Sequence, residues 1–174
     1  LQSDLQYYKL FMEWGMDGEV NEFLEEVFQW LSENLPANQN PKKLCWGDSR
    51  IGNVLFENFQ VKSLLDWEMA TIGDPLCDLA WGLTTDDVSS HGLNIEKLSG
   101  SISNQEAIKF WENNTGYSAD NFSYYRILCL FKFSVIMIRV AKKLIHNQIM
   151  PLDSDFHVNN HVSNYLRQEF NEKN

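Results

Sequence analysis

Oxygen-bearing side chains gather in one stretch of the sequence, between Leu44 and Ala80, near the ends of two short apolar runs. Asp48 is followed five residues later by Asn53, and Asp66 comes at the end of the second apolar run. Carboxylate and amide oxygens are the ligands that a hard divalent cation such as magnesium takes, usually together with some of its water. The residue types therefore indicate a magnesium site, provided that the fold brings these three residues together.

A loop followed by a β-hairpin would bring the three side chains together. Residues 48–53 have the composition of a loop, in which Gly52 permits backbone angles that other residues avoid. Residues 53–57 and 61–65 have strand propensity, and Asn58 between them is a typical turn residue. We therefore predict a β-hairpin, with Asp66 leaving the end of its second strand.

Three sequence motifs follow one another here: WGDxxxxN at residues 46–53, LDWE at residues 65–68 and GDPxxDLA at residues 73–80. In this order and at this spacing they resemble the aminoglycoside phosphotransferase family, which groups antibiotic kinases with choline-kinase-like enzymes in a protein-kinase-like fold. The motifs are most similar to those of phosphotransferase domains related to the ones fused to some acyl-CoA dehydrogenases, which usually read HGDxRxGN, LDWE and GDPxxDLAW. The resemblance is strong over residues 44–82 and weak elsewhere.

The resemblance implies a kinase that transfers the γ-phosphate of ATP or GTP to a hydroxyl group of a small metabolite, with Mg²⁺. Such a transfer requires positioning and charge neutralisation more than covalent help. Asp48 would be the catalytic base that takes the hydroxyl proton, and Arg50 would meet the transferring phosphate as a fixed cation. Asn53 and Asp66 would hold the magnesium, and Glu68 would assist with a second metal ion or its waters.

One position departs from the family pattern. The family often has a histidine that braces the metal loop where this chain has Trp46. We expect the tryptophan to brace the loop by packing, with the loss of one polar contact. The departure leaves open a second interpretation, a non-catalytic, pseudokinase-like module that binds a nucleotide or another ligand.

A third interpretation, a phosphohydrolase with Asp66 as nucleophile, is disfavoured by the residues that follow. Such enzymes of the haloacid-dehalogenase type require Asp-x-Asp-x-Thr, whereas residues 66–70 read DWEMA. Two other carboxylates are assigned structural roles. Asp74 precedes Pro75 at a predicted helix start, where it can accept free backbone amides. Asp78, one turn inside the helix among apolar residues, is expected to be hydrogen-bonded and to hold the catalytic loop.

Composition and charge favour one globular domain over residues 1–174. The chain is 44% hydrophobic and 13% aromatic, with a formal net charge of −10. A chain this acidic argues against a nucleic acid or an anionic membrane as partner, because both call for a basic face. The three cysteines, Cys45, Cys77 and Cys129, are widely spaced in apolar segments, which predicts buried thiols in a reducing compartment such as the cytoplasm.

Helical periodicity dominates outside the motifs, so the predicted fold class is α+β, mainly α. Helices are predicted over residues 3–14, 19–35, 75–84, 103–114, 120–147 and 155–172, with a short buried strand at 44–46 and a mobile loop at 85–101. No nucleotide-binding lobe is recognisable before residue 44. The resemblance therefore implies most of the C-terminal, helical lobe of a longer kinase-like protein, with the N-terminal nucleotide-binding lobe absent from the chain and the lobe alone inactive.

Two further patterns are interpreted as structural and not as functional. The long apolar segment at 120–147 is interrupted by Arg126, Lys132 and Arg139, so we expect a core helix and no membrane span. His157 and His161 would share a face of the last predicted helix, at a spacing that can bind metal. Because no third ligand accompanies them, we expect solvent-facing histidines.

Overall fold

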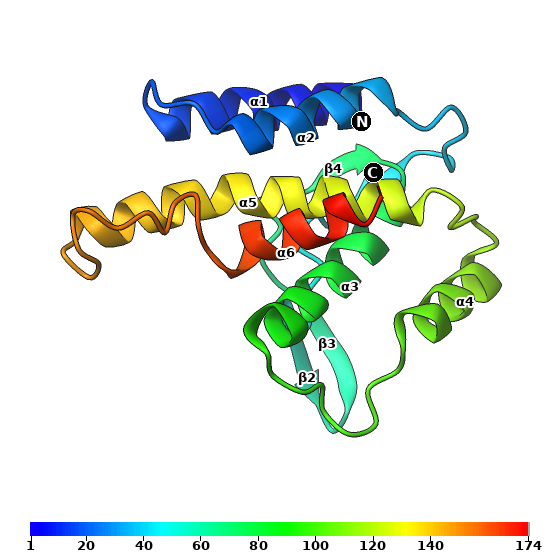
Figure 1. The fold of residues 1–174 in the computed structure, drawn as a ribbon. Helices are drawn as coiled ribbons and strands as arrows, with labels where there is room; N and C mark the ends of the chain where they lie inside the picture. Colours follow the sequence, from blue (N-terminus) through cyan, green and yellow to red (C-terminus); the bar gives the residue numbers. More distant parts are fainter. Residues whose placement is uncertain (174) are drawn as a thin grey trace. The chain divides into compact units, whose positions relative to one another are not determined.

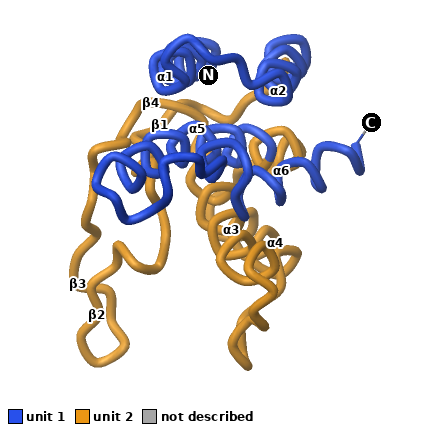
Figure 2. The backbone as a smooth tube through the Cα atoms, turned by 60° about the vertical axis from the view of Figure 1, so that its left-hand side comes forward, with its two compact units in different colours: residues 1–35, 127–174 blue, residues 36–126 orange. Residues whose placement is uncertain are grey.

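The computed structural model describes residues 1–173 and is mainly helical, with two small antiparallel sheets (Figure 1). The predicted fold class, α+β and mainly α, is confirmed. The backbone divides into two compact units (Figure 2): residues 1–35 together with residue 127 onward, and residues 36–126. The boundary falls inside the long helix α5, Phe122–His146.

The first unit is built from helices. Helices α1 (Gln2–Met16) and α2 (Glu22–Glu33) pack against each other, and the unit also contains the larger part of α5 and helix α6 (His161–Asn171). Asn21 begins α2 because its side chain accepts the backbone N–H of Leu24. Apolar side chains from all four helices form the core of this unit, among them Leu5, Met12, Leu24, Leu31, Ile138 and Leu166.

The predicted last helix is shorter than expected at its N-terminus. The Asn160 side chain accepts the backbone N–H groups of Val162 and Ser163, so α6 begins at His161 and not at residue 155. His157 therefore lies in a turn, 3.4 Å from Glu19, and the two histidines do not share a helix face. Burial lowers the pKa of His161, which keeps this imidazole neutral at pH 7.

The second unit holds all the motif residues. Strand β1 (Lys43–Cys45) pairs with β4 (Thr71–Gly73), and β2 (Val54–Glu57) forms the predicted hairpin with β3 (Gln60–Leu64). Asn58 and Phe59 both have positive φ angles, 51° and 61°, as a two-residue hairpin turn of type I′ requires. Helices α3 (Leu76–Ser90) and α4 (Asn104–Thr115) follow and contact each other.

Two predictions about this unit are wrong. The helix predicted over residues 75–84 continues as α3 to Ser90, followed by a short 3₁₀ turn at His91–Leu93, so the polar segment is half helical. The buried polar side chains of this segment are hydrogen-bonded, either to the backbone of the helix or to residues elsewhere in the chain. The polar composition therefore did not indicate a loop. The strand expected to be buried has only Cys45 inside; Leu44 is 64% exposed, because a two-stranded sheet covers one face only.

The local helix signals before α4 are confirmed. Ser103 and Glu106 form a reciprocal capping box, and Gly116 ends the helix in a left-handed conformation.

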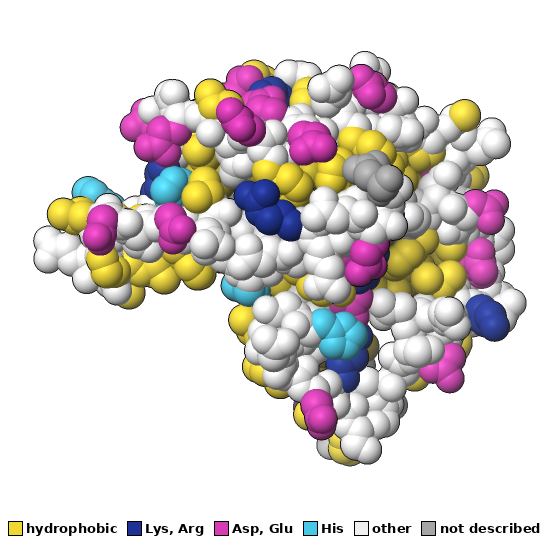
Figure 3. Space-filling view, in the orientation of Figure 1, with side chains coloured by type: hydrophobic (Ala, Val, Ile, Leu, Met, Phe, Trp, Pro, Cys, Tyr) yellow, Lys and Arg dark blue, Asp and Glu magenta, His cyan; other side chains and the backbone are white. Residues whose placement is uncertain are grey.

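On the face drawn in Figure 3, acidic side chains are spread over the surface and basic side chains are few, in keeping with the net charge. Within residues 1–173, no helix has the length and apolarity needed for a membrane span.

Candidate active site

The Asp48 carboxylate, just after β1, is surrounded by hydrogen-bond donors. Trp81 on α3 donates its indole N–H to Oδ1 at 2.7 Å, while Asn53 Nδ2 and Arg50 Nε donate to Oδ2 at 2.6 Å and 3.0 Å. The Asp48 side chain is 14% exposed, so one part of it still faces solvent. The structure thus brings Asp48, Arg50 and Asn53 together and fixes the direction of a carboxylate that can accept a proton.

Asn53 folds back onto Asp48 at the end of a one-turn 3₁₀ helix, Ile51–Asn53. Its Nδ2 group also donates to the Asp48 carbonyl at 3.1 Å, and the residue is 7% exposed. Both bonds use the amide nitrogen, and the amide oxygen accepts no hydrogen bond from residues 1–173. Asn53 therefore orients Asp48 while leaving an oxygen available to another ligand.

Helix α3 anchors the loop through Asp78. Its carboxylate accepts the backbone N–H of Trp46 at 2.7 Å and that of Gly47 at 2.8 Å. The Ser49 hydroxyl in turn donates to the Asp78 carbonyl at 2.6 Å. The helix and the loop approach so closely at Gly82 that a Cβ atom there would lie 2.7 Å from the Ser49 carbonyl oxygen. Asp78 thus has the supporting contacts that the sequence led us to expect.

Gly47 lies where the loop meets the segment after β3. Its φ angle is +90°, a conformation that disfavours any side chain, and a Cβ atom there would lie 2.2 Å from the Met69 carbonyl oxygen. The glycine thus meets two independent requirements, backbone conformation and close approach. At this point the segment that contains Asp66 lies against the loop of residues 46–53.

Asp74 fastens the start of α3. Buried to 3% exposure, it accepts the backbone N–H of Leu76 at 2.9 Å, both amide donors of Asn40 at 3.0 Å and the hydroxyl of Tyr125 at 3.2 Å. Burial, with the neighbouring Cys77 and Asp74, raises the pKa of the Tyr125 hydroxyl, so this group stays protonated and donates. The contacts of Asp74 are those of the structural helix-start residue that we expected.

Asp66 and Glu68 lie in the exposed segment after β3. The backbone N–H of Leu65 donates to the Asn53 carbonyl at 2.8 Å, so Asp66 directly follows a bond to the loop of residues 46–53. Asp66 has a left-handed backbone conformation, φ 61°. In the described part of the chain, its carboxylate and that of Glu68 pair with no basic side chain, and no three His, Cys, Asp or Glu side chains form a ready metal cluster.

The available oxygens nevertheless suit magnesium. The Asn53 amide oxygen and the Asp66 carboxylate are hard donors, lie on backbone segments that are hydrogen-bonded to each other, and have no hydrogen-bond partner within residues 1–173. Mg²⁺ commonly keeps several waters and uses one or two protein oxygens, so a site of two donors fits it.

Trp46 corrects one expectation. Its indole N–H donates to the Leu65 carbonyl at 2.7 Å, and its ring lies 6.0 Å from that of Trp67. The tryptophan therefore braces the loop by a hydrogen bond as well as by packing, and the expected loss of a polar contact at this position is wrong. Trp81 was missed altogether as a site residue; the tryptophan that follows Asp78-Leu79-Ala80 in the family motif was the available signal.

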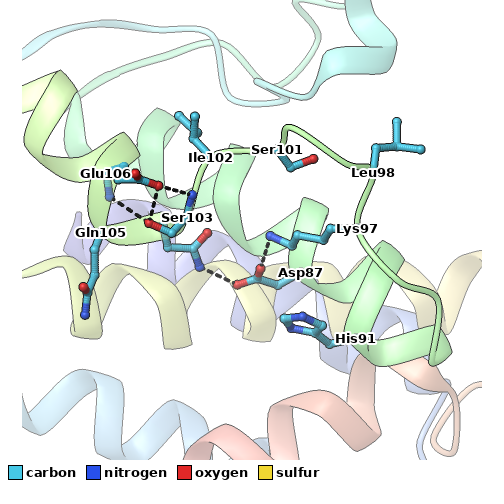
Figure 4. Close-up of a pocket in the computed structure, with 10 residues that line it drawn as sticks. Asp87, His91, Lys97, Leu98, Ser101, Ile102, Ser103, Gln105 and Glu106 are labelled. Carbon is cyan, nitrogen blue, oxygen red and sulfur yellow. Dashed lines mark hydrogen bonds and ion pairs between the residues drawn. The ribbon is translucent and has the colours of Figure 1, made fainter.

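A cavity of about 470 Å³ lies at the other end of α3, lined by residues of α3, the following loop and the start of α4 (Figure 4). Asp87 points into its wall, where it is paired with Lys97 at 2.7 Å and with Arg126 at 2.6 Å, and accepts the side-chain amide of Asn104. Burial would raise the pKa of Asp87, but these hydrogen bonds outweigh it and hold that pKa below its ordinary value.

A sequence model described as the phosphotransferase enzyme family matches residues 3–107, and the chain belongs to this family. The resemblance inferred from the motifs is thereby confirmed. In fold the chain is similar to a solved structure from Ralstonia eutropha assigned as an aminoglycoside phosphotransferase, with a TM-score of 0.73 and 18% identity over 97% of this chain and 52% of that one.

Curated relatives of this chain include acyl-CoA dehydrogenase family member 11 from two vertebrates. The Pongo abelii protein is 33% identical over 124 residues, which is 65% of this chain and 16% of the relative. The Gallus gallus protein is 33% identical over 138 residues, which is 71% of this chain and 18% of the relative. The chain thus spans less than a fifth of these relatives.

Proposed function

We propose that this chain is the C-terminal lobe of a small-molecule kinase, which transfers the γ-phosphate of ATP or GTP to a hydroxyl group of a small metabolite. The observation that carries the proposal is the Asp48 carboxylate, held by Trp81, Asn53 and Arg50 yet still partly open to solvent. A base must stand beside the hydroxyl whose proton it takes, in a fixed direction, and the three donors supply that direction.

Arg50 is proposed to meet the transferring phosphate. One of its nitrogens, Nε, is bonded to Asp48, while the side chain as a whole is 52% exposed. A guanidinium group has further N–H donors beyond Nε, and these are free to bind phosphate oxygens in the paired geometry that arginine favours. Arg50 would then link the base to the group that moves.

Asn53 and Asp66 are proposed to hold Mg²⁺ through their side-chain oxygens, with Glu68 binding its waters or a second ion. When bound there, the ion neutralises charge on the nucleotide phosphates. The chain's own part is to keep two oxygen donors beside the base, through the backbone bond between Leu65 and Asn53.

The nucleotide would be bound largely by a lobe outside this chain. The proposal is supported by the solved structure of similar fold, of which this chain covers 52%. The cytoplasm is the proposed compartment, since Cys45, Cys77 and Cys129 form no disulfide.

The cavity beside Asp87 is proposed to receive part of the acceptor. Asp87 is six residues along α3 from Trp81, a rise of about 9 Å, and the two residues lie about 120° apart around the helix axis. The relatives are named as acyl-CoA dehydrogenase family members, which favours a hydroxylated acyl metabolite over an antibiotic.

A non-catalytic binding module was suggested by Trp46 in place of histidine. Trp46 donates a hydrogen bond to the segment that contains Asp66, so the residue at this position does not favour an inactive site. The phosphohydrolase interpretation likewise gains nothing, since the residue two positions after Asp66 is Glu68 and both side chains are exposed.

The test is a screen of nucleotide consumption by the full-length protein against pooled hydroxylated metabolites with Mg²⁺, run in parallel on Asp48→Asn. We expect acceptor-dependent consumption by the wild type, its loss in the variant, and unchanged nucleotide binding. Equal rates in the two proteins would refute the role of Asp48, and magnesium-dependent nucleotide binding without turnover of any pool would favour the binding module.

A further inference from the structure

We propose that Trp46 and Trp67 act together as an indole clamp that positions the Asp66 carboxylate. The clamp consists of these two side chains and of the two carbonyl groups that they hold, those of Leu64 and Leu65. The inference rests on the proposed function, because it concerns the residue that is proposed to bind the metal. Both tryptophans are positioning residues and touch no reacting atom.

The two indoles bind consecutive carbonyl groups directly before Asp66. Trp67 Nε1 donates to the Leu64 carbonyl at 2.9 Å, and Trp46 Nε1 donates to the Leu65 carbonyl at 2.7 Å. The ring centres are 6.0 Å apart and the planes are inclined by 35°, within the range of aromatic contact. One indole comes from the catalytic loop and the other from the Asp66 segment itself, so the clamp joins the two segments.

Asp66 is a residue that needs such support. Its φ angle of 61° lies in the left-handed region, which aspartate tolerates better than most residues but still at some cost, so neighbouring contacts help to maintain it. Asp66 is exposed to solvent, and β3 before it is exposed along its whole length. Packing therefore contributes little here, and hydrogen bonds to the adjacent backbone decide the direction of the carboxylate.

The clamp continues a chain of contacts that begins on a rigid element. Asp78 on α3 holds the backbone N–H of Trp46, Trp46 holds the carbonyl of Leu65, and the N–H of Leu65 holds the carbonyl of Asn53. Leu65 is thus fixed at both its N–H and its carbonyl, directly before Asp66. Removing the indole N–H of Trp46 would release one of these two attachments and leave the other.

The test compares Trp46→Phe, which removes the donor and keeps an aromatic ring, with Trp46→His, which restores a ring N–H. Trp67→Phe removes the more exposed donor and serves as a second, milder variant. Trp14→Phe makes the same chemical change at an exposed tryptophan of α1 and is the matched control. The readouts, on the metal-free full-length protein, are Mn²⁺ affinity by electron paramagnetic resonance and deuterium exchange of the peptide spanning residues 62–70.

We expect Trp46→Phe to weaken Mn²⁺ binding about tenfold, the equivalent of one lost hydrogen bond, and to speed exchange in residues 62–70. Trp46→His should recover most of both effects, and Trp14→Phe should show neither. Wild-type affinity and exchange in both Trp46→Phe and Trp67→Phe would overturn the clamp. Asp66→Asn separates the two proposals: unchanged Mn²⁺ affinity in that variant would refute the metal site itself, while the exchange data would still decide on the clamp.

Discussion

Asp78→Asn is the substitution that tests most sharply how the catalytic loop is held. The Asp78 carboxylate accepts two backbone N–H groups, of Trp46 at 2.7 Å and of Gly47 at 2.8 Å. An asparagine of the same shape keeps one acceptor oxygen and turns an NH₂ group towards the other N–H. The variant should therefore lose one bond outright and weaken the second.

The magnitude follows from the chemistry of these bonds. A hydrogen bond to a charged group contributes about 1.5–3 kcal/mol, and a neutral acceptor is about half as strong. The local free energy of opening should therefore fall by about 3 kcal/mol. Since about 1.4 kcal/mol corresponds to a factor of ten, the backbone amides of Trp46 and Gly47 should exchange about 100-fold faster.

The assay is hydrogen–deuterium exchange with mass spectrometry on the full-length protein, followed on the peptide that spans residues 44–50. Asp153→Asn makes the same change at an exposed carboxylate and should leave this peptide at its wild-type rate. The reasoning would be refuted if Asp78→Asn exchanged as slowly as the control, because the loop would then be held by contacts other than this carboxylate.

Three further predictions concern single residues. Gly47→Ala should destabilise the site by about 3 kcal/mol or more, because the cost of the left-handed backbone adds to that of the collision with the Met69 carbonyl. Thermal melting measures the loss of stability, and an unchanged midpoint would contradict the prediction. Trp81→Phe removes one of the three donors to Asp48, so it should lower kcat about tenfold or more and leave nucleotide affinity unchanged. Steady-state kinetics measures kcat, and a wild-type kcat in the variant would count against this role. The pKa of Asp87 lies below its ordinary 3.8, so the stabilisation from this group is complete above that pH and is lost as pH falls through the lower folded value. Hydrogen exchange in α3 and α4 should therefore show that stability falls more steeply with decreasing pH in the wild type than in Asp87→Asn. An equal dependence on pH in the two proteins would argue against this role of Asp87.

The parts of the site that could be predicted from the sequence are those whose partners lie close in the chain. Asp48 and Asn53 are five residues apart and belong to one motif, and the hairpin after them carries its own turn signal. The same holds for the capping box of Ser103 and Glu106, which is a local pattern with a local consequence.

The parts that were missed depend on partners far along the chain. Trp81 reaches Asp48 across 33 residues, so the family motif could signal that this tryptophan matters but not that it contacts Asp48. Asp87 sits in a polar segment that predicted a loop, yet Arg126, 39 residues away, pairs with it and allows the helix to continue. The prediction that the first strand is buried failed for a related reason, because the exposure of Leu44 depends on how many strands the sheet contains.

The central claim is that a base and two cation-binding oxygens meet at one point of this lobe. A crystal structure of the full-length protein with Mn²⁺ and a non-hydrolysable nucleotide tests it directly, through the anomalous signal of the metal. We predict a Mn²⁺ peak about 2.0–2.3 Å from both the Asn53 amide oxygen and the Asp66 carboxylate, with Asp48 facing the terminal phosphate. A metal bound elsewhere, with the side chains of Asn53 and Asp66 directed apart, would contradict the account.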